Sequence, residues 1–549
     1  MPESIPRFSF EAENTDPPGT FKLIRDDETD MHGQRTVMLD PVPSSDPNEP
    51  LNWSMIRKLV NFGIVLAMTI VIFTALSIQA IFWQQMAIDM KLTLKDLNKA
   101  CSVNYVGLAI GCILFIPISK KYGRRPVYIV SAALMLATSF WISRIDCLAE
   151  LYVANLVQGL AGATNESIAE ITIADLFFVH HRGSMNGLYM TCVMIGNFLT
   201  PMAAGAQATR HGWRSSYQTM GIFNAFVFVV FLFFYEETKY IPLFTGKADT
   251  VIKENDVVNQ GKSHEQVRVE AASTTPGSSI TERTTSHHML DLTIPQRPWH
   301  KRFAFVTQTP EPIWPHFYRP FCVLVFPAVT FAALQYAAGI VWLTVTTSVL
   351  SLRFPEAPYF FSPAQIGYTG TGPLIGNIIG AVYGGLISDW SILYYARRNR
   401  GYYEPEMRLY ILHLPAVFMA GGIIMFGVTV SRGMHWIWPN LGGAFFAFGL
   451  GAISDAVLVF VMDSYREITG EAFTAVTFMR NALSIGIPFA ISPWIERSGI
   501  QNMFIVCGTV SLAITALTIP MILWGKSARV VLASQYHDIE DEHGHAGAQ

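Results

Sequence analysis

Four residues that recur every four positions form the most chemically suggestive pattern in this sequence: Gln158, Gly162, Glu166 and Glu170. In a helix this spacing places all four on one face. The residues around them are apolar enough for a membrane span, where an ionised side chain costs at least a few kcal/mol. We therefore expect Glu166 and Glu170 to bind a solute or a proton. The structural alternative is a protonated Glu166 that only hydrogen-bonds a neighbouring helix.

The position of Glu166 along its helix supports a role at the centre of the membrane. If Asp175 marks the end of the helix, Glu166 lies nine residues inside it, or about 13 Å at ~1.5 Å per residue. That depth is close to the middle of a bilayer whose hydrocarbon core is about 30 Å thick. The sequence therefore favours Glu166 as the first functional candidate, ahead of Glu170.

A second segment carries a similar arrangement of acidic residues. Asp455 precedes Asp463 by eight residues, a spacing close to the nine residues between Glu166 and Asp175. Two such carboxylates facing one cavity would suit an organic cation, a polyamine or a proton. Arg480, at a comparable depth in a later span, offers Asp455 a fixed ion pair instead. Both interpretations remain open from the sequence.

Amide and aromatic side chains in another apolar stretch would complete a binding cavity. Gln335 and Tyr336 would offer hydrogen bonds to a solute, and Trp342 would present an aromatic face to a cation. Tyr and Trp also gather at bilayer interfaces without binding a ligand. Because Tyr336 lies deep in its stretch, we expect it to face the cavity.

The elements that would hold these residues are long apolar helices. Hydrophobic residues make up 51% of the chain and charged residues 14%, against about a quarter charged in soluble domains. A bilayer span needs ~20 apolar residues, and two blocks at 59–235 and 319–525 each contain six such stretches. The expected spans are 59–83, 99–119, 126–144, 150–173, 186–208, 214–235, 320–350, 363–388, 409–430, 436–461, 472–494 and 502–525. We predict an all-α membrane protein with twelve transmembrane helices in two six-helix halves.

The segments outside these two blocks are an N-terminal tail at 1–58, a linker at 236–318 and a C-terminal tail at 526–549, and charged residues are dense at 1–58, at 236–302 and in the last twenty residues. Basic residues flank the outermost spans and occur in the central linker, so the positive-inside rule predicts that both termini and the linker are cytosolic. The linker is rich in Ser and Thr between about 245 and 295, and we expect it to be largely disordered.

Several classes of function receive no support from the sequence. The net charge of −3 gives no basic bias toward nucleic acid, and the six Cys residues stand singly, without the spacing of a metal site or a disulfide framework. No glycine-rich phosphate loop follows a strand, which leaves ATP-driven pumping unsupported. We expect no enzymatic activity and no cofactor. The expected partners are a small-molecule substrate, protons and the lipid bilayer.

The loop after the second span has a distinctive sequence, KKYGRRPVYI at 120–129. It resembles the signature loop of the major facilitator superfamily, a short basic loop with a turn glycine between two spans. The match includes Gly123, Arg124 and Arg125. We expect the loop to turn tightly at the glycine, and its arginines to bond Asp175 and hold the inner side closed. The alternative is a plain positive anchor at the membrane surface.

Other segments extend the resemblance over most of the membrane region. GGLISDW at 384–390, which contains Asp389, repeats the loop position in the second half, and LVQGLAG at 156–162 resembles the family's motif in the fourth span. The chain is also similar to a fungal branch grouped with drug:proton antiporters, which includes polyamine-type and secondary-metabolite exporters. The segments that carry this similarity are 46–58, 175–189 and 460–481.

Three positions depart from the family's motifs. Lys120 stands where the signature loop normally has Asp, Asn155 stands where the fourth span normally has Arg, and Thr200 replaces a Gly in the antiporter motif of the fifth span. A proton pathway through the usual arginine of the fourth span is therefore excluded. The direction of transport stays open.

The resemblance implies a proton-coupled secondary transporter that works by alternating access. We expect it to export a small organic molecule, such as a secondary metabolite, a toxin or a drug, as a monomer in the cell membrane. The alternative is an importer of an organic cation such as a polyamine. A membrane sensor that does not transport is a further alternative, and the short tails argue against it.

Overall fold

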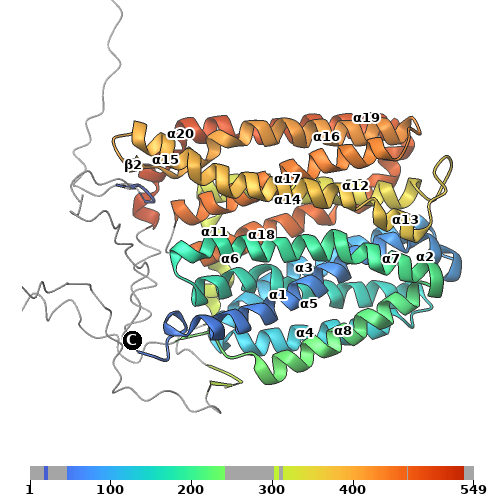
Figure 1. Ribbon diagram of the computed structural model, residues 1–549, viewed down its shortest axis with the longest axis horizontal. Coiled ribbons are helices and arrows are strands. Elements are labelled where there is room, and N and C mark those ends of the chain that lie inside the picture. The colour runs from blue at the N-terminus through green and yellow to red at the C-terminus, as the bar shows by residue number, and fades with distance from the viewer. Residues whose placement is uncertain are drawn as a thin grey trace, which may run out of the picture.

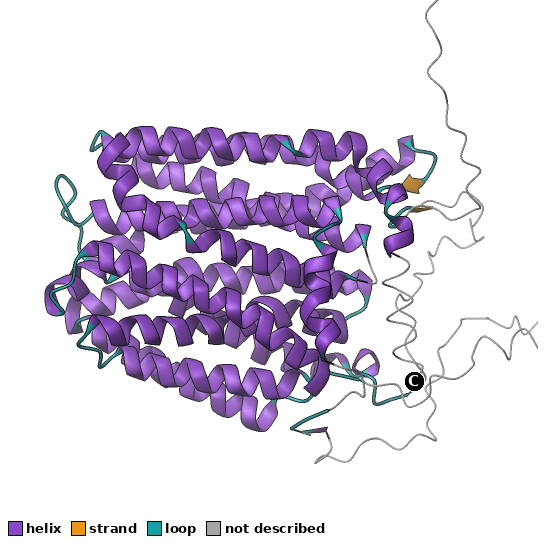
Figure 2. Ribbon diagram, turned by 180° about the vertical axis from the view of Figure 1, so that it is seen from behind, coloured by secondary structure: helices purple, strands orange, loops and turns teal. Residues whose placement is uncertain are grey.

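Each long apolar stretch forms a helix, because a backbone in lipid must satisfy its hydrogen bonds within its own segment. The computed structural model describes residues 18–22, 46–240, 302–303, 305–307, 313–465 and 468–536. Within these ranges, the side chains of residues 21–22, 179–184 and 389 are outside the description. The long helices run side by side along one axis of the molecule (Figure 1, Figure 2).

The first half of the chain crosses the bundle six times. Its segments are α1 (Met55–Ile81), α3 (Leu94–Tyr122), α4 (Arg124–Ile142), α5 (Leu148–Leu176), the continuous run of α6 (Val179–Met194), η2 (Ile195–Leu199) and α7 (Thr200–His211), and α8 (Trp213–Phe234). The short helices η1 (Pro50–Asn52) and α2 (Trp83–Asp89) lie before and after α1. The five residues of η2 form a π-helical turn.

The second half repeats this plan after a short helix, α11 (Trp314–Val323). Its helices are α12 (Pro327–Arg353), the run of α13 (Pro363–Tyr368), α14 (Thr371–Val382), η3 (Tyr383–Ile387) and α15 (Ser388–Arg398), then η4 (Pro405–Leu412), α16 (His413–Ser431), α17 (Ile437–Ser464), α18 (Thr469–Ile485), α19 (Ile487–Ala516) and α20 (Thr518–Val531). A π-helical turn, η3, again interrupts the second segment. Two short strands, β1 (Phe21–Lys22) and β2 (Tyr402–Tyr403), pair antiparallel.

The predicted number of spans is confirmed. Ten stretches of described helix are long and apolar enough to cross a membrane. One of them runs from Thr469 to Val531 and is two spans, because Gly499, with a φ of 73°, turns the chain within α19. The 29-residue α5 adds the remaining span; buried polar residues such as Asn155 and Gln158 lower its hydropathy. The described residues thus form twelve spans in two halves of six.

The start of the seventh span differs from the prediction of 320–350. The chain leaves α11 at Val323 and begins α12 at Pro327. Proline has no backbone N–H and a fixed φ, so it is suited to the first turn of a new helix and poorly suited to the interior of an old one. α11 is therefore a separate helix that packs against α18 and α3, one from each half.

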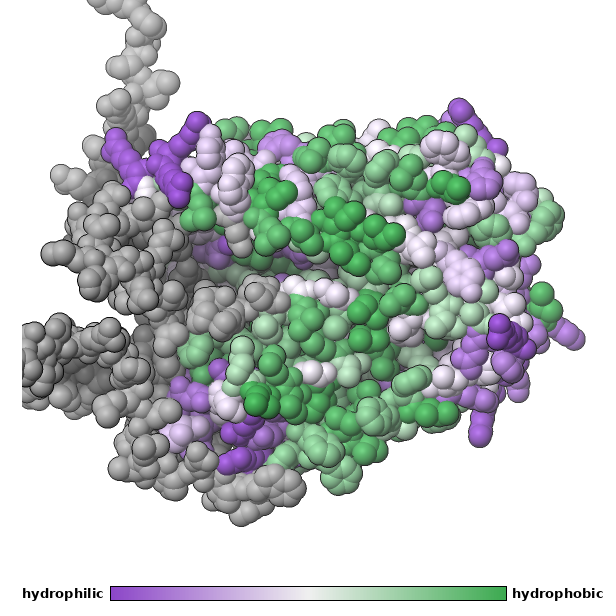
Figure 3. All heavy atoms as spheres, viewed as in Figure 1, coloured by the Kyte–Doolittle hydropathy of each residue, from purple (hydrophilic) through white to green (hydrophobic). Residues whose placement is uncertain are grey.

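Polar residues gather at the two ends of the bundle, and apolar residues cover the surface between them (Figure 3). We call the end that carries Gly123, Glu237 and β2 the linker end; it lies at the left in Figure 1. The opposite end, which carries α2 and α13, is the far end. The stretch from 245 to 295 that was expected to be disordered lies outside the described residues.

A ladder of glycines lets two helices of the second half pack closely. A Cβ on Gly376 would lie 2.0 Å from the carbonyl oxygen of Ala444, and a Cβ on Gly380 would lie 2.3 Å from that of Phe448. No side chain fits at these distances, so α14 and α17 meet backbone to backbone. Small residues that recur at every fourth position commonly allow such close contact between membrane helices.

Candidate functional site

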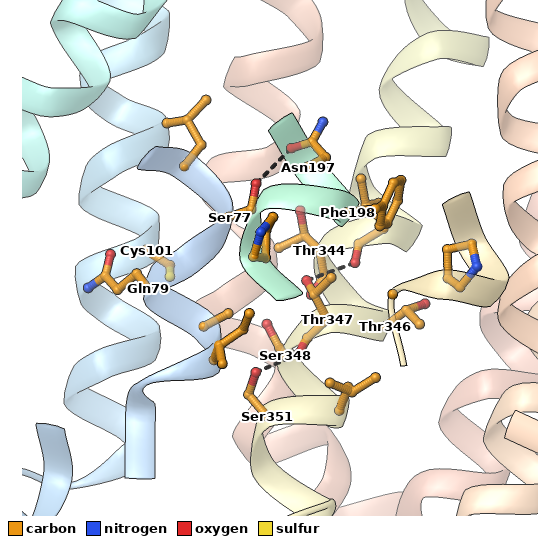
Figure 4. Close-up of a pocket in the computed structure, with 18 of the residues that line it drawn as sticks. Ser77, Gln79, Cys101, Asn197, Phe198, Thr344, Thr346, Thr347, Ser348 and Ser351 are labelled. Carbon is orange, nitrogen blue, oxygen red and sulfur yellow. Dashed lines mark hydrogen bonds between the residues drawn. The ribbon is translucent and has the colours of Figure 1, made fainter. Parts of the chain in front are cut away.

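A cavity of about 210 Å³ lies between the two halves. Its wall is mainly apolar, with hydroxyl and amide groups from several helices. Figure 4 shows Ser77 of α1 facing Asn197 of η2, with Thr344 and Thr347 of α12 nearby. The Ser77 hydroxyl donates to Asn197 Oδ1 at 2.9 Å. The cavity can therefore surround an organic molecule with apolar contacts and offer it a few hydrogen bonds.

Among the described residues, the charged side chains in the cavity wall are Glu166 and Arg480. The two form an ion pair between Arg480 Nη2 and Glu166 Oε2, and both side chains are buried. Glu166 comes from α5 in the first half and Arg480 from α18 in the second. The ion pair thus joins the halves, and its opposite charges leave the wall neutral.

Two further side chains complete the surroundings of this pair. Asn481 Nδ2 donates to Glu166 Oε2 at 3.0 Å, and Asn481 Oδ1 accepts from Arg480 Nη2 at 3.0 Å. Tyr336 accepts a hydrogen bond from Arg480 Nη1 at 3.0 Å, and its ring lies 5.1 Å from the guanidinium carbon. The guanidinium thus has three partners, which fix its plane as the buried charge requires.

Close contact between α3 and α5 holds Glu166 in place. A Cβ on Gly159 would lie 2.0 Å from the carbonyl oxygen of Asn104, so the backbones touch there. Asn165, next to Glu166, donates to Thr69 Oγ1 of α1 at 2.9 Å. These contacts set the rotation of α5, and that rotation directs Glu166 toward the second half.

Glu170, one turn further along α5, is not in the cavity wall. Its Oε2 atom is buried and has no hydrogen-bond partner among the described residues. The predicted stripe therefore divides into a paired carboxylate, Glu166, and a carboxylate with an unsatisfied oxygen, Glu170.

Tyr336 contacts Arg480 but does not itself line the cavity, and Trp342 is also absent from the wall. Asp455 and Gln335, which were predicted to face the cavity, lie elsewhere. Asp455 does not line the cavity and does not pair with Arg480, which binds Glu166 instead; its Cβ lies next to Gly384 of η3. Gln335 is buried against α19, where its Nε2 donates to the carbonyl oxygen of Ile514 at 2.7 Å. In both cases the rotation of the helix turns the side chain toward a neighbour within the same half. Periodicity alone does not fix that rotation.

The signature loop turns at Gly123, which has a φ of 108°. A Cβ on this glycine would lie 2.4 Å from Glu237 Oε2. Glu237 accepts hydrogen bonds from the backbone N–H groups of Arg124 at 2.9 Å and Arg125 at 3.1 Å. Burial raises the pKa of the Glu237 carboxyl, and these hydrogen bonds act against that rise. The carboxylate therefore caps the start of α4, where the helix dipole favours negative charge.

The contact predicted between the loop and α5 is present. Arg124 Nε donates to Asp175 Oδ2 at 3.0 Å, whereas Arg125 Nη2 donates to the carbonyl oxygen of Leu232 at 2.8 Å. The second half repeats the first contact with Arg408 and Asp463, at 2.7 Å. Asp389 belongs to α15, and its side chain lies outside the description. A role for these residues in gating stays a prediction.

Lys120, which departs from the family's motif, forms an ion pair with Glu471 at the start of α18. The pair joins the two halves at the linker end. At the far end, Lys95 of α3 forms an exposed ion pair with Glu496 of α19 at 2.7 Å. A Cβ on Gly205 of α7 would lie 2.5 Å from the carbonyl oxygen of Pro363, so backbone packing also closes this end. The halves are thus in contact at both ends of the cavity.

Several residues of the site were not identified from the sequence. Asn481 was missed, although its position directly after an arginine in an apolar helix was a usable signal. Ser77 and Asn197 gave none, because single hydroxyls and amides are common in membrane helices. Trp83, directly after α1, is also buried and lines the cavity.

The chain is similar in sequence to known membrane transporters. A family model described as Major Facilitator Superfamily matches residues 65–488. The chain is 27% identical to an uncharacterized MFS-type transporter of Schizosaccharomyces pombe over 519 residues, which are 91% of this chain and 89% of the relative. It is 25% identical to multidrug transporter TPO1_2 of Candida glabrata, over 88% of this chain and 77% of that protein.

The fold is also that of a solved transporter. A crystal structure of the peptide transporter POT superimposes with a TM-score of 0.56 at 13% identity, over 86% of this chain and 95% of that chain. This likeness shows the fold alone. Because the family model covers most of the chain and the curated relatives are transporters rather than enzymes, this protein is a membrane transporter of the Major Facilitator Superfamily.

Proposed function

We propose that the chain is a proton-coupled exporter of a small organic molecule, and that the Glu166–Arg480 pair couples the proton to the movement of the halves. The observation that carries this proposal is the position of the pair, in the cavity wall and across the boundary between the halves. A contact there must change when the two halves move relative to each other. A group that changes its charge at this point can therefore bias the movement.

Protonation of Glu166 would remove the charge that holds Arg480. The guanidinium would keep its hydrogen bonds to Tyr336 and Asn481, so the arginine would stay solvated by the protein while its bond across the halves weakens. Glu170 offers a second place for the proton, because its buried Oε2 lacks a partner among the described residues. Two carboxylates one turn apart can pass a proton between them.

The cavity wall suggests the chemical class of the substrate. It is neutral as long as the ion pair is intact, and it combines aromatic and aliphatic surface with hydroxyl and amide groups. Such walls bind molecules of mixed character, with apolar surface supplying most of the affinity and polar groups fixing orientation. The multidrug transporter of Candida glabrata among the relatives supports export.

The gates of this cycle would be the contacts at the two ends. The Lys120–Glu471 pair would close the linker end, and the Lys95–Glu496 pair with the packing at Gly205 would close the far end. We infer that the linker end faces the cytosol, and the basic residues that flank the outermost spans and occur in the linker support this orientation. Arg124 and Asp175 would brace the first half as it rocks.

Reconstituted vesicles with an imposed pH gradient test the proposal. A panel of neutral and cationic amphipathic dyes should move against the direction of proton flow, and dissipation of the gradient by a proton carrier should stop this movement. Dye movement at a rate that does not depend on the pH gradient would contradict proton coupling. Movement in the same direction as the protons would contradict export by antiport.

The second candidate is uptake of an organic cation such as a polyamine. The unsatisfied carboxylate oxygen of Glu170 favours it, because a cationic group that moved beyond the present cavity wall could supply the missing partner. In the same vesicles, a polyamine would compete with the transported dye and would itself accumulate with the protons. Export of neutral dyes without competition by polyamine would reject this candidate.

A further inference from the structure

The end of α20 carries a guanidinium that the membrane domain alone does not satisfy. Arg529 is fully buried, with a side-chain exposure of 0%. Its Nε and Nη2 atoms donate to the two carboxylate oxygens of Glu406 at 3.0 and 2.6 Å. The remaining Nη1 donates to the carbonyl oxygen of Pro18 and to Thr20 Oγ1, the latter at 3.2 Å. A segment near the N-terminus thus completes the hydrogen bonds of this arginine.

The backbone of that segment fits a narrow crevice in the second half. Gly19 has a φ of 81°, a conformation that other residues rarely adopt. A Cβ on Gly19 would lie 2.4 Å from the carbonyl oxygen of Asp463 and 3.1 Å from Cγ of Pro405. The crevice therefore accepts glycine at this position and excludes larger residues.

The next two residues extend the contact by strand pairing. Phe21 of β1 lies opposite Tyr403 of β2, and Lys22 lies opposite Tyr402. Figure 1 shows this blue strand beside the orange and red helices of the second half, away from the remainder of the blue chain. Addition of an extended segment to an exposed strand is a common mode of peptide recognition, in which backbone hydrogen bonds supply the affinity.

The crevice is adjacent to a contact between the halves. Asp463, which Gly19 touches, is next to the last residue of α17. The following helix, α18, begins at Thr469, and Glu471 in its first turn forms the ion pair with Lys120 of the first half. A ligand that holds the end of α17 in place therefore also steadies the start of α18.

We propose that the crevice formed by Arg529, Glu406 and the end of α17 is a peptide-docking site whose occupant is residues 18–22 of this chain. Docking stabilises the junction of α17 and α18 and, through it, the Lys120–Glu471 contact; its effect on closure rests on the proposed function, in which this contact closes the linker end. The N-terminal segment then acts as a brace that favours the state closed at this end. This role is separate from the carriage of substrate and protons.

A disulfide test in the full-length protein addresses the docking itself. Facing residues in an antiparallel pair have Cα atoms about 4.5–5.5 Å apart, within the range that a disulfide spans. The Lys22→Cys/Tyr402→Cys protein should form an intramolecular disulfide under mild oxidation, and neither single variant should. Adding Gly19→Ala should slow this reaction strongly. Absence of the disulfide, or a rate that Gly19→Ala leaves unchanged, would overturn the proposal.

Hydrogen–deuterium exchange addresses the consequence and does not depend on transport. In Gly19→Ala, amides of residues 468–472 should exchange about tenfold faster than in the wild type, the change expected when roughly one hydrogen bond to a charged group is lost. Gly212→Ala is the matched control, because Gly212 has a similar φ of 80° and open surroundings. Equal exchange in the wild type and Gly19→Ala would show that docking does not brace α18.

Discussion

Arg480 on α18 binds Glu166 on α5, so one buried ion pair joins the two halves inside the cavity. Removal of a single partner from such a pair leaves an uncompensated buried charge, which typically costs about 3–5 kcal/mol. Neutralising both partners together avoids that penalty. The pair should therefore behave as one unit in stability measurements and in transport.

Variants of this ion pair should differ in stability in a definite order. Arg480→Met should lower the melting temperature most, because Glu166 would keep only the amide of Asn481 as a donor. Glu166→Gln should lower it less, because its amide oxygen can still accept from the guanidinium. The Glu166→Gln/Arg480→Met double variant should recover most of the loss. Thermal unfolding in detergent measures all three variants. A double variant whose loss in melting temperature equals the sum of the two single losses would contradict the coupling.

Lys120 and Glu471 should be exchangeable as a pair. Lys120→Glu and Glu471→Lys should each reduce flux, because like charges would then face each other across the linker end, where Glu471 is buried. The double variant restores opposite charges and should restore flux. Lys121→Glu is the matched control, because the ion pair with Glu471 is formed by the neighbouring Lys120 and not by Lys121. A double variant no better than either single variant would reject the contact as a gate.

Gly123→Ala should destabilise the protein by more than backbone strain alone. Gly123 has a φ of 108° and a ψ of 167°, a region that is nearly restricted to glycine and costs another residue about 1–3 kcal/mol. The new Cβ would also lie 2.4 Å from Glu237 Oε2. Gly212→Ala provides the comparison, because Gly212 has a positive φ without close neighbours. Thermal unfolding should show a clearly larger loss at Gly123. Equal losses would mean that the contact with Glu237 is unimportant.

Asp455→Asn should leave transport and its pH dependence unchanged. The side chain lies outside the cavity wall and makes no ion pair with Arg480. Asparagine has nearly the same volume, so packing against η3 should be kept. Flux at several pH values in vesicles measures the effect. A loss of pH dependence would place the proton site in the second half.

The sequence predicts the spans well because hydropathy over twenty residues depends on local composition. It also predicts that Glu166 and Glu170 share one helical face, because residues four positions apart in a helix lie on the same side. The break between α11 and α12 was missed because the apolar stretch continues across it, and only Pro327 marks the new helix.

Partners across the halves could not be predicted, because they depend on tertiary packing between distant segments. From the sequence, Lys120 is only a departure from the family's motif. In the structure it pairs with Glu471, which is 351 positions away in the chain. Arg480 had two acidic candidates at similar depth, and the rotation of α5 and α17 decides between them. Gln335 was misplaced for the same reason, since rotation of α12 directs it toward α19.

The most direct test of the account is proton-driven flux with Glu166→Gln. The glutamine keeps the shape of the side chain and an oxygen that can accept from Arg480, but it cannot ionise. Because the uncompensated arginine lowers stability, flux is compared at equal amounts of protein in the membrane. Flux in vesicles should then become independent of the pH gradient, while the wild type at equal protein density follows it. Flux with unchanged dependence on the gradient would contradict a role for Glu166 in proton coupling.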